Sequence, residues 1–336
     1  MKKKYLVILF GMSLFSSCIE EPDLPENTYR ENFETLWKIV DTKYCYLDIK
    51  DIDWDSVYTV YNFRLATDTV GELTFFDAMA EMLATLKDGH VNLYSGFDRS
   101  RYWKWFTDYQ PNFSSNLIYN EHYLGEHYRS VNGLRYNKIA NGEVGYIYYS
   151  SFSDSFSDKN FFYIQQYFKD CKGLIIDVRN NGGGSAELSN RLASYFFQRD
   201  TVSLYMQHKT GPGHSDFSAP QPMRTVANKA IQWQLPVVVL ANRSSYSATN
   251  MFVCRMKDAP NAIVVGDVSG GGGGLPLSNE LPNGWMVRFS SSPMLDGNMR
   301  HIEFGIEPDV YVTLDSVDVA KGRDTLIDYA VGRIIN

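Results

Sequence analysis

The stretch from Val237 to Gly274 constrains the fold more than any other part of this 336-residue chain. A short β-branched run, Val237–Leu240, is followed by a polar cluster and then by a segment that carries Met251 and Met256 among polar residues. A second apolar run, Ile263–Val265, comes next. Short apolar runs between turn residues indicate buried strands, and spaced apolar residues indicate a helix. The stretch therefore predicts a strand–turn–helix–strand unit.

The same order of elements occurs earlier in the chain. Residues 145–150 and 173–178 predict strands, and residues 160–168 and 186–197 predict helices. The later predicted elements are a strand at 286–291, a turn and strand at 305–312, and a closing helix at 325–335 capped by Asp324. Alternating strands and helices predict an α/β core, here over residues 143–336, with helices packed on a sheet.

The N-terminal third predicts helices instead. One helix is expected behind a cap at Thr28 and a second near Asp53. A third is expected to begin with a capping box at Thr74–Asp77 and to end at a C-cap on Gly89. Residues 28–94 therefore predict an N-terminal helical subdomain.

Residues 95–142 are rich in Tyr, Asn and Ser and lack a long periodic pattern, which predicts a connector of loops and short strands. Residues 19–27 are acidic and contain two prolines, which is typical of a tether.

The first residues have the pattern of a bacterial signal. Lys2–Lys4 precede the apolar segment Tyr5–Phe15, which is too short to span a bilayer but fits a signal peptide. Its end, LFSSC, resembles the lipobox of bacterial lipoproteins, which implies removal of residues 1–18 as a signal and lipidation of Cys18. An ordinary secretory signal is the alternative, because Phe15 stands where leucine is usual.

The expected location is the cell envelope, with the protein attached to the outer membrane by its lipid and facing the periplasm or the cell surface. Glu20–Glu21 resemble the acidic signal that directs some bacterial lipoproteins to the surface. Three further cysteines are widely spaced and form no CxxC pair, which predicts buried thiols.

Composition excludes several function classes. The chain has 44% hydrophobic and 21% charged residues, which is typical of a globular protein. Its net charge of −7, without a basic stripe, argues against a nucleic-acid partner. The glycine run 270–274 lacks the Lys-Ser/Thr of a phosphate-binding loop, and neither HExxH nor GxSxG occurs. No metal and no cofactor are expected.

Three short motifs remain as candidates for chemistry. They are the serines Ser244, Ser245 and Ser247, the turn 180–184, and the sequence 88–90. A serine between a strand and a helix lies at a helix N-terminus, where free N–H groups can stabilise an oxyanion. The alternative is that the serines only cap the helix and that 88–90 only ends one.

Several segments resemble the C-terminal processing (tail-specific) serine peptidases, in that family's order. They are GLIIDVRNNGGG (173–184), VVVLANRSSYSATNMFV (237–253), IVVGD (263–267) and GIEPDV (305–310). LKDGH (86–90) resembles the branch of the family that uses histidine. The resemblance implies a ClpP/crotonase-like core. Residues 95–142 are too short and loop-like for the PDZ module that many relatives carry, so none is expected.

Carried over position by position, the family's nucleophile falls on Ser247. The catalytic lysine of the better-known branch falls on Gly272, so that base is absent here. The resemblance instead implies His90 as the base, and the ordinary pKa of histidine suits this role at neutral pH. Glu303 is implied as the residue that orients the histidine, although its spacing to Gly305 is one residue shorter than in the family pattern.

The implied oxyanion hole consists of the N–H groups of Gly183 and Ala248. Some relatives carry a serine directly before the histidine, where this chain has Gly89. The sequence therefore predicts a serine-type peptidase that acts on peptides or protein tails. A non-catalytic peptide- or ligand-binding lipoprotein on the same fold is the alternative, and hydrolysis of a small ester would use the same residues. The oligomeric state is left open.

Overall fold

The computed structural model describes residues 26–65 and 71–336. The predicted signal, its Cys18 and most of the tether lie outside the described residues. A seven-stranded sheet has the strand order β12-β9-β8-β5-β4-β3-β2. Its strands are β2 (Arg129–Val131), β3 (Leu134–Ile139), β4 (Val144–Tyr149), β5 (Gly173–Asp177), β8 (Val237–Ala241), β9 (Ala262–Gly266) and β12 (Val310–Tyr311). Strands β12 to β4 run parallel, and β3 and β2 are antiparallel.

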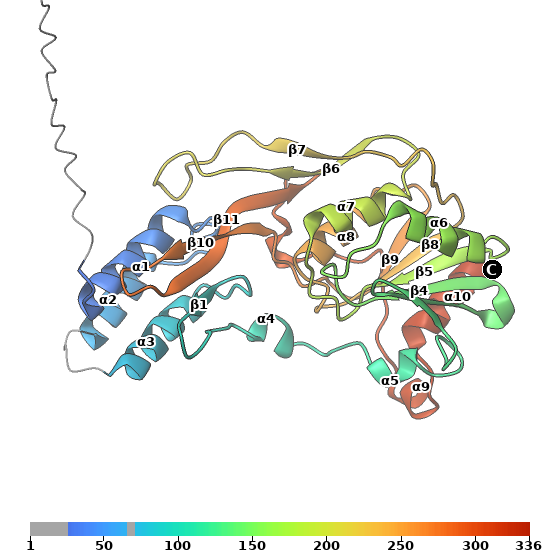
Figure 1. The fold of residues 1–336 in the computed structure, drawn as a ribbon, viewed down its shortest axis with the longest axis horizontal. Coiled ribbons are helices and arrows are strands. Elements are labelled where there is room, and N and C mark those ends of the chain that lie inside the picture. Colours follow the sequence, from blue (N-terminus) through green and yellow to red (C-terminus); the bar gives the residue numbers. More distant parts are fainter. Residues whose placement is uncertain (1–25, 66–70) are drawn as a thin grey trace, which may run out of the picture.

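Helices cover both faces of this sheet, which is therefore the centre of a mixed α/β fold (Figure 1). They are α6 (Asp158–Tyr167), α7 (Ala186–Ser194), α8 (Ala248–Met256) and α10 (Thr325–Ile335). Helix α10 lies on one face, and α6, α7 and α8 lie on the other. Parallel neighbours cannot be joined by tight hairpins and need crossovers, which α6 and α8 provide.

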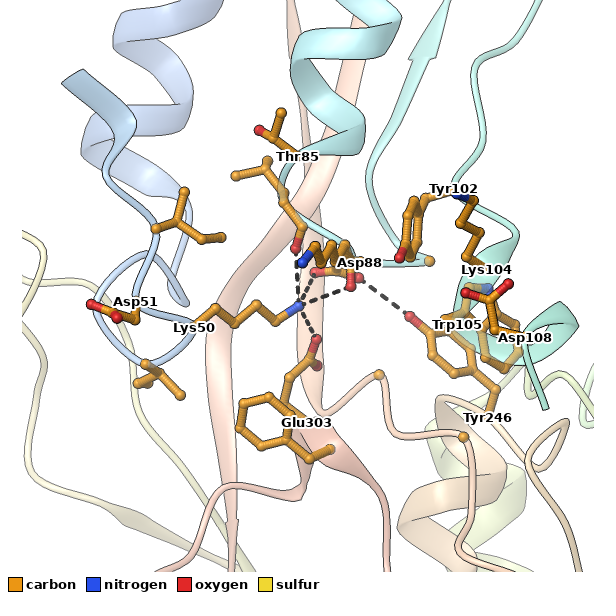
Figure 2. Close-up of a pocket in the computed structure, with 18 of the residues that line it drawn as sticks. Lys50, Asp51, Thr85, Asp88, Tyr102, Lys104, Trp105, Asp108, Tyr246 and Glu303 are labelled. Carbon is orange, nitrogen blue, oxygen red and sulfur yellow. Dashed lines mark hydrogen bonds and ion pairs between the residues drawn. The ribbon is translucent and has the colours of Figure 1, made fainter. Parts of the chain in front are cut away.

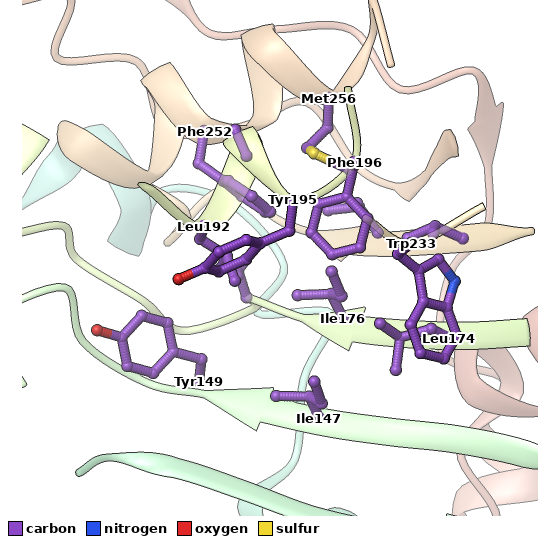
Figure 3. Packing of buried hydrophobic residues seen from close by; sticks show 14 of the residues in the cluster. Ile147, Tyr149, Leu174, Ile176, Leu192, Tyr195, Phe196, Trp233, Phe252 and Met256 are labelled. Atoms are coloured by element: carbon purple, nitrogen blue, oxygen red, sulfur yellow. The ribbon is translucent and has the colours of Figure 1, made fainter. Parts of the chain in front are cut away.

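The core of this part lies between the sheet and helices α6, α7 and α8. Ile147, Ile176 and Val239 point from the strands into a cluster that includes Leu192 and Phe252, and Figure 3 shows part of it. Every residue of β5 and β8 is buried. Strands buried on both faces form continuous apolar runs, which is why the sequence identified them.

The N-terminal helices pack on a second sheet. The helices are α1 (Tyr29–Lys43), α2 (Trp54–Arg64) and α3 (Glu72–Ala84). The second sheet consists of β1 (Asn92–Tyr94), β6 (Thr201–Met206), β7 (Gln221–Thr225), β10 (Gly274–Glu280) and β11 (Met286–Asp296). Phe33 and Met79 of the helices share one buried cluster with Val287 and Phe289 of β11. The helices of 28–94 thus complete their core with a strand from the other end of the chain.

Residues 95–142 contain α4 (Lys104–Thr107), α5 (Ser115–Ile118), β2, β3 and the 3₁₀ turn η1 (Ala140–Gly142). Because β3 pairs with β4, the core sheet begins ahead of the predicted boundary at 143. The C-terminal part also contains η2 (Ile302–Phe304) and α9 (Ser316–Ala320).

Three of the predicted helix caps are confirmed. The side chains of Thr28, Asp53 and Asp324 accept hydrogen bonds from the first turns of α1, α2 and α10. The predictions for α3 are wrong at both ends: its N-cap is Gly71 rather than Thr74, and it ends before Gly89. Phe75 and Phe76 are buried on the first turns of α3, and this packing stabilises a helix that begins before the capping box at Thr74.

The three described cysteines, Cys45, Cys171 and Cys254, are buried and form no disulfide. Over residues 26–65 and 71–336, no helix is long and apolar enough to cross a bilayer. The same ranges hold no group of three or more His, Cys, Asp or Glu side chains placed to bind a metal ion.

Candidate active site

Ser247 lies between β8 and α8 in a backbone conformation that L-residues rarely adopt, with φ 58° and ψ −119°. Such a conformation costs about 1–3 kcal/mol and persists only where neighbours hold it. The Ser247 N–H donates to the Gly271 carbonyl at 2.9 Å, and the Tyr246 N–H donates to the Asn181 carbonyl at 3.1 Å. The Ser247 side chain makes no cap bond to α8. It is therefore not a simple helix cap.

The neighbouring serines have different environments. Ser245 is buried, and its hydroxyl donates to the Val178 carbonyl at 2.8 Å and accepts from the Asn242 N–H at 3.1 Å. These bonds tie the turn to the end of β5. The Ser244 N–H donates to the Asn242 side chain at 3.1 Å. Ser245 thus stabilises the turn that presents Ser247.

The structure brings His90 to Ser247. The Nε2 atom of His90 lies 3.0 Å from Ser247 Oγ, although the residues are 157 positions apart. His90 follows α3 in a turn before β1, and its N–H donates to Asp88 Oδ1 at 2.7 Å. Burial disfavours the charged imidazolium and lowers the pKa of His90 to about 4, although the negative charge of Asp88 acts in the opposite direction. The imidazole is therefore neutral at neutral pH and able to accept a proton.

Sequence reasoning missed the surroundings of Asp88. Its carboxylate accepts hydrogen bonds from the hydroxyls of Tyr44 at 3.1 Å, Tyr246 at 3.3 Å and Ser290 at 2.9 Å. Asp88 lies in the LKDGH motif, from which the sequence predicts a role for His90 alone. Ser290 and Tyr44 carry no local signal, because their role depends on the approach of β11 and the segment after α1.

Glu303 was implied as the residue that orients His90, and its contacts differ from this expectation. Its Oε1 pairs with Lys50 Nζ at 2.6 Å, and its Oε2 accepts from the Gly273 N–H at 2.9 Å. Among the described residues, the ring nitrogens of His90 contact the hydroxyls of Ser247 and Ser290 instead. The Gly273 N–H and Lys50 hold the carboxylate away from the imidazole.

Lys50 lies between two buried carboxylates. Its Nζ is 2.6 Å from Glu303 and 4.0 Å from Asp88, and it also donates to the carbonyls of Leu86 and Lys87. Burial opposes its charge, but the two carboxylates outweigh burial and raise the pKa of Lys50. Lys50 is therefore charged.

The two carboxylates differ in their charge. Burial opposes ionisation of Asp88, but Lys50 and the hydrogen bonds outweigh it and lower its pKa. Burial, and then the Asp88 charge, raise the pKa of Glu303 to about 7. The lasting negative charge of the pair is therefore on Asp88.

A cavity of about 660 Å³ adjoins this cluster. Figure 2 shows Lys50, Asp88 and Glu303 meeting at one side of it and Trp105 of α4 on the other. Tyr246 also lines the cavity, stacks on Trp105 with ring centroids 4.0 Å apart, and lies 4.9 Å from the His90 ring. Tyr246 therefore contacts His90 and lines the cavity at the same time.

Tyr246 also explains why glycine occupies two nearby positions, Gly272 and Gly89. A Cβ on Gly272, which has φ +72°, would lie 2.4 Å from its ring, so the position aligned with the family's lysine has no room for a side chain. A Cβ on Gly89 would lie 2.6 Å from Trp105 Nε1 and 2.9 Å from the Tyr246 hydroxyl oxygen. The serine that some relatives carry before the histidine therefore does not fit here.

The two implied oxyanion donors are neighbours. Ala248 is the first residue of α8, so its N–H has no acceptor within the helix. A Cβ on Gly183 would lie 2.9 Å from Ser247 Cβ and 3.0 Å from the Ala248 nitrogen. The Gly183 N–H donates to Asn181 Oδ1 at 3.0 Å. An oxyanion at this place would have to share the Gly183 N–H with Asn181.

Comparison with known proteins identifies the family. The family model described as peptidase family S41 matches residues 143–312, which is half of the chain. The chain belongs to peptidase family S41. A second model, the tricorn protease C1 domain, matches residues 25–84, which include α1, α2 and α3.

Curated relatives of this S41 chain include two carboxy-terminal processing proteases of Bacillus subtilis (strain 168). CtpB is 28% identical over 178 residues, which are 52% of this chain and 35% of CtpB. CtpA is 26% identical over 189 residues, which are 55% of this chain and 38% of CtpA. The match thus spans little more than a third of these relatives' length.

Solved structures cover more of the chain. A putative peptidase from Parabacteroides merdae ATCC 43184 is 48% identical, with a TM-score of 0.88 over 93% of this chain and 98% of that one. Mature CPAF complexed with lactacystin is 13% identical, with a TM-score of 0.67 over 91% of this chain and 97% of that one. The second likeness concerns the fold alone.

Proposed function

We propose that this S41 protein is a serine-type peptidase that hydrolyses peptide bonds in peptides or protein tails, with Ser247 as nucleophile and His90 as general base. The main support is the 3.0 Å distance between His90 Nε2 and Ser247 Oγ. A serine hydroxyl is a weak nucleophile unless a base within hydrogen-bonding distance takes its proton. The neutral His90 meets this need, and no lysine stands at Gly272 to do so.

The reaction follows the acyl-transfer pattern. As Ser247 Oγ bonds to the substrate carbonyl carbon, its proton moves to His90 Nε2. The C–N bond then breaks, and His90 returns the proton to the leaving amine. Water, deprotonated by the same imidazole, hydrolyses the acyl-enzyme and regenerates Ser247. These steps use only the two side chains, backbone N–H groups and water.

The developing oxyanion would lie against the Ala248 N–H and the Gly183 N–H. Each donor in such a site contributes about 3–4 kcal/mol to the transition state. The strained φ of Ser247 supports this proposal, because it turns Oγ away from a capping position and toward His90.

A fluorophosphonate probe tests the nucleophile, and a peptide library read by mass spectrometry tests the reaction. The full chain is expected to label once, and Ser247→Ala should lower labelling and hydrolysis by at least about 10⁴-fold. Ser244→Ala, three residues away, is the matched control and should react like the wild type. Labelling that persisted in Ser247→Ala would contradict the assignment. A wild type that bound peptides but neither labelled nor hydrolysed them would favour the non-catalytic alternative.

The lipid anchor at Cys18, the location in the cell envelope and the absence of a PDZ module stay predictions from the sequence. Incorporation of a fatty-acid analogue in cells, lost in Cys18→Ala, tests the anchor.

A further inference from the structure

The second nitrogen of His90 faces a serine that no sequence motif singled out. His90 Nδ1 lies 3.4 Å from the hydroxyl oxygen of Ser290, a residue 200 positions away on β11. Ser290 is fully buried, and its hydroxyl donates to Asp88 Oδ2 at 2.9 Å. A chain of side chains thus runs from Asp88 through Ser290 and His90 to Ser247.

The direction of the hydrogen bonds in this chain follows from the charge of Asp88. An ionised carboxylate only accepts hydrogen bonds, so the Ser290 proton points at Asp88. The Ser290 lone pairs then face His90 and favour the tautomer with a proton on Nδ1. In that tautomer Nε2 has no proton and can accept one from Ser247, whereas the other tautomer cannot.

Asp88 is well suited to keep this direction. It is buried, and four donors surround it: the hydroxyls of Tyr44, Tyr246 and Ser290 and the N–H of His90. Lys50, 4.0 Å away, supplies the compensating charge. Burial and multiple donors favour a fixed, ionised carboxylate over a rotating one.

We propose that Ser290 and Asp88 are the positioning residues of His90, in place of the Glu303 that the family resemblance implied. Ser290 fixes the tautomer and orientation of the imidazole, and Asp88 fixes the direction of the Ser290 hydroxyl. The proposal rests on the proposed function, in which His90 is the base. Glu303 instead pairs with Lys50, and it therefore affects His90 indirectly, through the Lys50 charge that lies beside Asp88.

The position of Gly89 agrees with this arrangement. Trp105 and Tyr246 occupy the space that a side chain at 89 would need. The hydroxyl beside the histidine therefore comes from β11, a strand that also packs against α1 and α3 through Phe289. Ser290 is tied in place by its backbone as well, because its carbonyl accepts from the Cys45 N–H at 3.1 Å.

The first test compares Ser290→Ala with Ser291→Ala, a neighbour on the same strand whose hydroxyl donates to the Leu275 carbonyl. The rate of fluorophosphonate labelling is measured on the full chain. Ser290→Ala should label about 10- to 100-fold more slowly, which is less than the 10²–10⁴-fold that a general base contributes, because His90 itself is still present. Ser291→Ala should label at the wild-type rate.

A second readout separates positioning from a loss of stability. Proteins with ¹⁵N-labelled histidine report the tautomer of His90 by NMR, with the signal assigned through His90→Gln. The wild type should show a proton on Nδ1, and Ser290→Ala should show a mixture of tautomers. Asp88→Asn provides an independent variant, because an amide can also donate to Ser290 and so no longer forces the direction of its proton.

Asp88→Asn should also change the pH dependence of labelling. Asp88, Lys50 and Arg288 are the charged groups that act on His90, and of these only Asp88 favours its protonated form. Removing that charge should lower the pKa of His90 further and move the acid limb of the labelling rate to lower pH.

The outcomes distinguish the two proposals. Unchanged labelling and an unchanged tautomer in Ser290→Ala would overturn the role of Ser290 while leaving the Ser247–His90 pair intact. A wild type that fails to label would instead contradict the proposed function. Slow labelling with an unchanged tautomer would also overturn the positioning role, because it would indicate a general loss of structure.

Discussion

At the scale of single residues, the site depends on two carboxylates that compete for one buried lysine. Asp88 has four hydrogen-bond donors around it, whereas Glu303 has Lys50 and one backbone N–H. The carboxylate with more hydrogen-bond donors keeps its charge, and the pKa of the other rises. Glu303 therefore titrates near neutral pH, beside a base that must remain neutral.

Glu303→Gln should reveal this titration as a pH-dependent change in stability. The pKa of Glu303 is raised from its ordinary 4.5 to about 7, so the folded state binds more protons than the unfolded state between these values. Its contribution to the free energy of unfolding is complete below the lower pKa and is lost as pH rises through the upper one. A glutamine at this position does not titrate, so the variant loses no stability through this effect as the pH rises.

Urea unfolding at pH 5, 6, 7 and 8 measures the effect of Glu303→Gln. The variant should gain stability relative to the wild type across this range, by up to about 3 kcal/mol. His90 titrates in both proteins, so its contribution cancels in the difference between their free energies of unfolding. Glu307→Gln, at an exposed position four residues on, is the control and should follow the wild type. Parallel curves for Glu303→Gln and the wild type would contradict the raised pKa.

At the scale of elements, the turn after β5 is anchored to the closing helix by a buried ion network. Arg179 is fully buried and pairs with Asp177 at 2.7 Å and Asp324 at 3.0 Å. Asp324 also caps α10 by accepting from the N–H groups of Leu326 and Ile327. The network therefore joins α10 to the strand end from which the turn at 180–184 begins.

Asp324→Ala should be strongly destabilising, because it leaves part of the buried Arg179 charge unpaired and removes a helix cap. Breaking a buried pair costs about 3–5 kcal/mol, and a lost cap costs about 0.5–2 kcal/mol. Asp315→Ala removes an exposed cap at α9 and should cost only the smaller amount. Chemical denaturation of both variants provides the comparison. Equal losses would show that the network adds nothing beyond the cap.

At the scale of the whole molecule, the proposed base and nucleophile lie beside two different hydrophobic clusters. His90 follows the helices that pack on β11, and Ser247 begins a helix packed on the seven-stranded sheet. Strand β11 belongs to the first cluster through Val287 and Phe289, and its Met294 shares another buried cluster with Met251 of α8. The alignment of the two residues thus depends on how β11 joins the two parts.

A chain that begins at Ser95 tests whether β11 needs the N-terminal helices to cover its apolar face. Without the N-terminal helices, it should expose the apolar face made by Leu281, Trp285, Val287 and Phe289, which are buried in the full chain. Exposed patches of this kind promote association and dye binding. Sedimentation and binding of a hydrophobic dye, measured against the full chain, report the outcome. A monomer that binds no dye would show that the β10–β11 hairpin does not need the helices.

The parts of the fold that the sequence predicted are those with local signals. The buried strands β5, β8 and β9, the helices between them, and the caps at Thr28, Asp53 and Asp324 all follow from apolar periodicity or a single capping side chain. Strands β6, β7 and β10 escaped prediction because they are partly exposed and lack a clear apolar pattern. Their place depends on pairing with each other and with β11.

For the candidate site, the sequence by itself predicted Ser247 and His90, because each lies in a short segment that resembles the family. The structure places them 3.0 Å apart. Only the tertiary structure decided what lies on the other side of the imidazole, namely Ser290 and not Glu303. The reason is physical: a hydrogen-bond partner is selected by distance and direction in space, and these depend on the paths of β11 and of the backbone around Gly273.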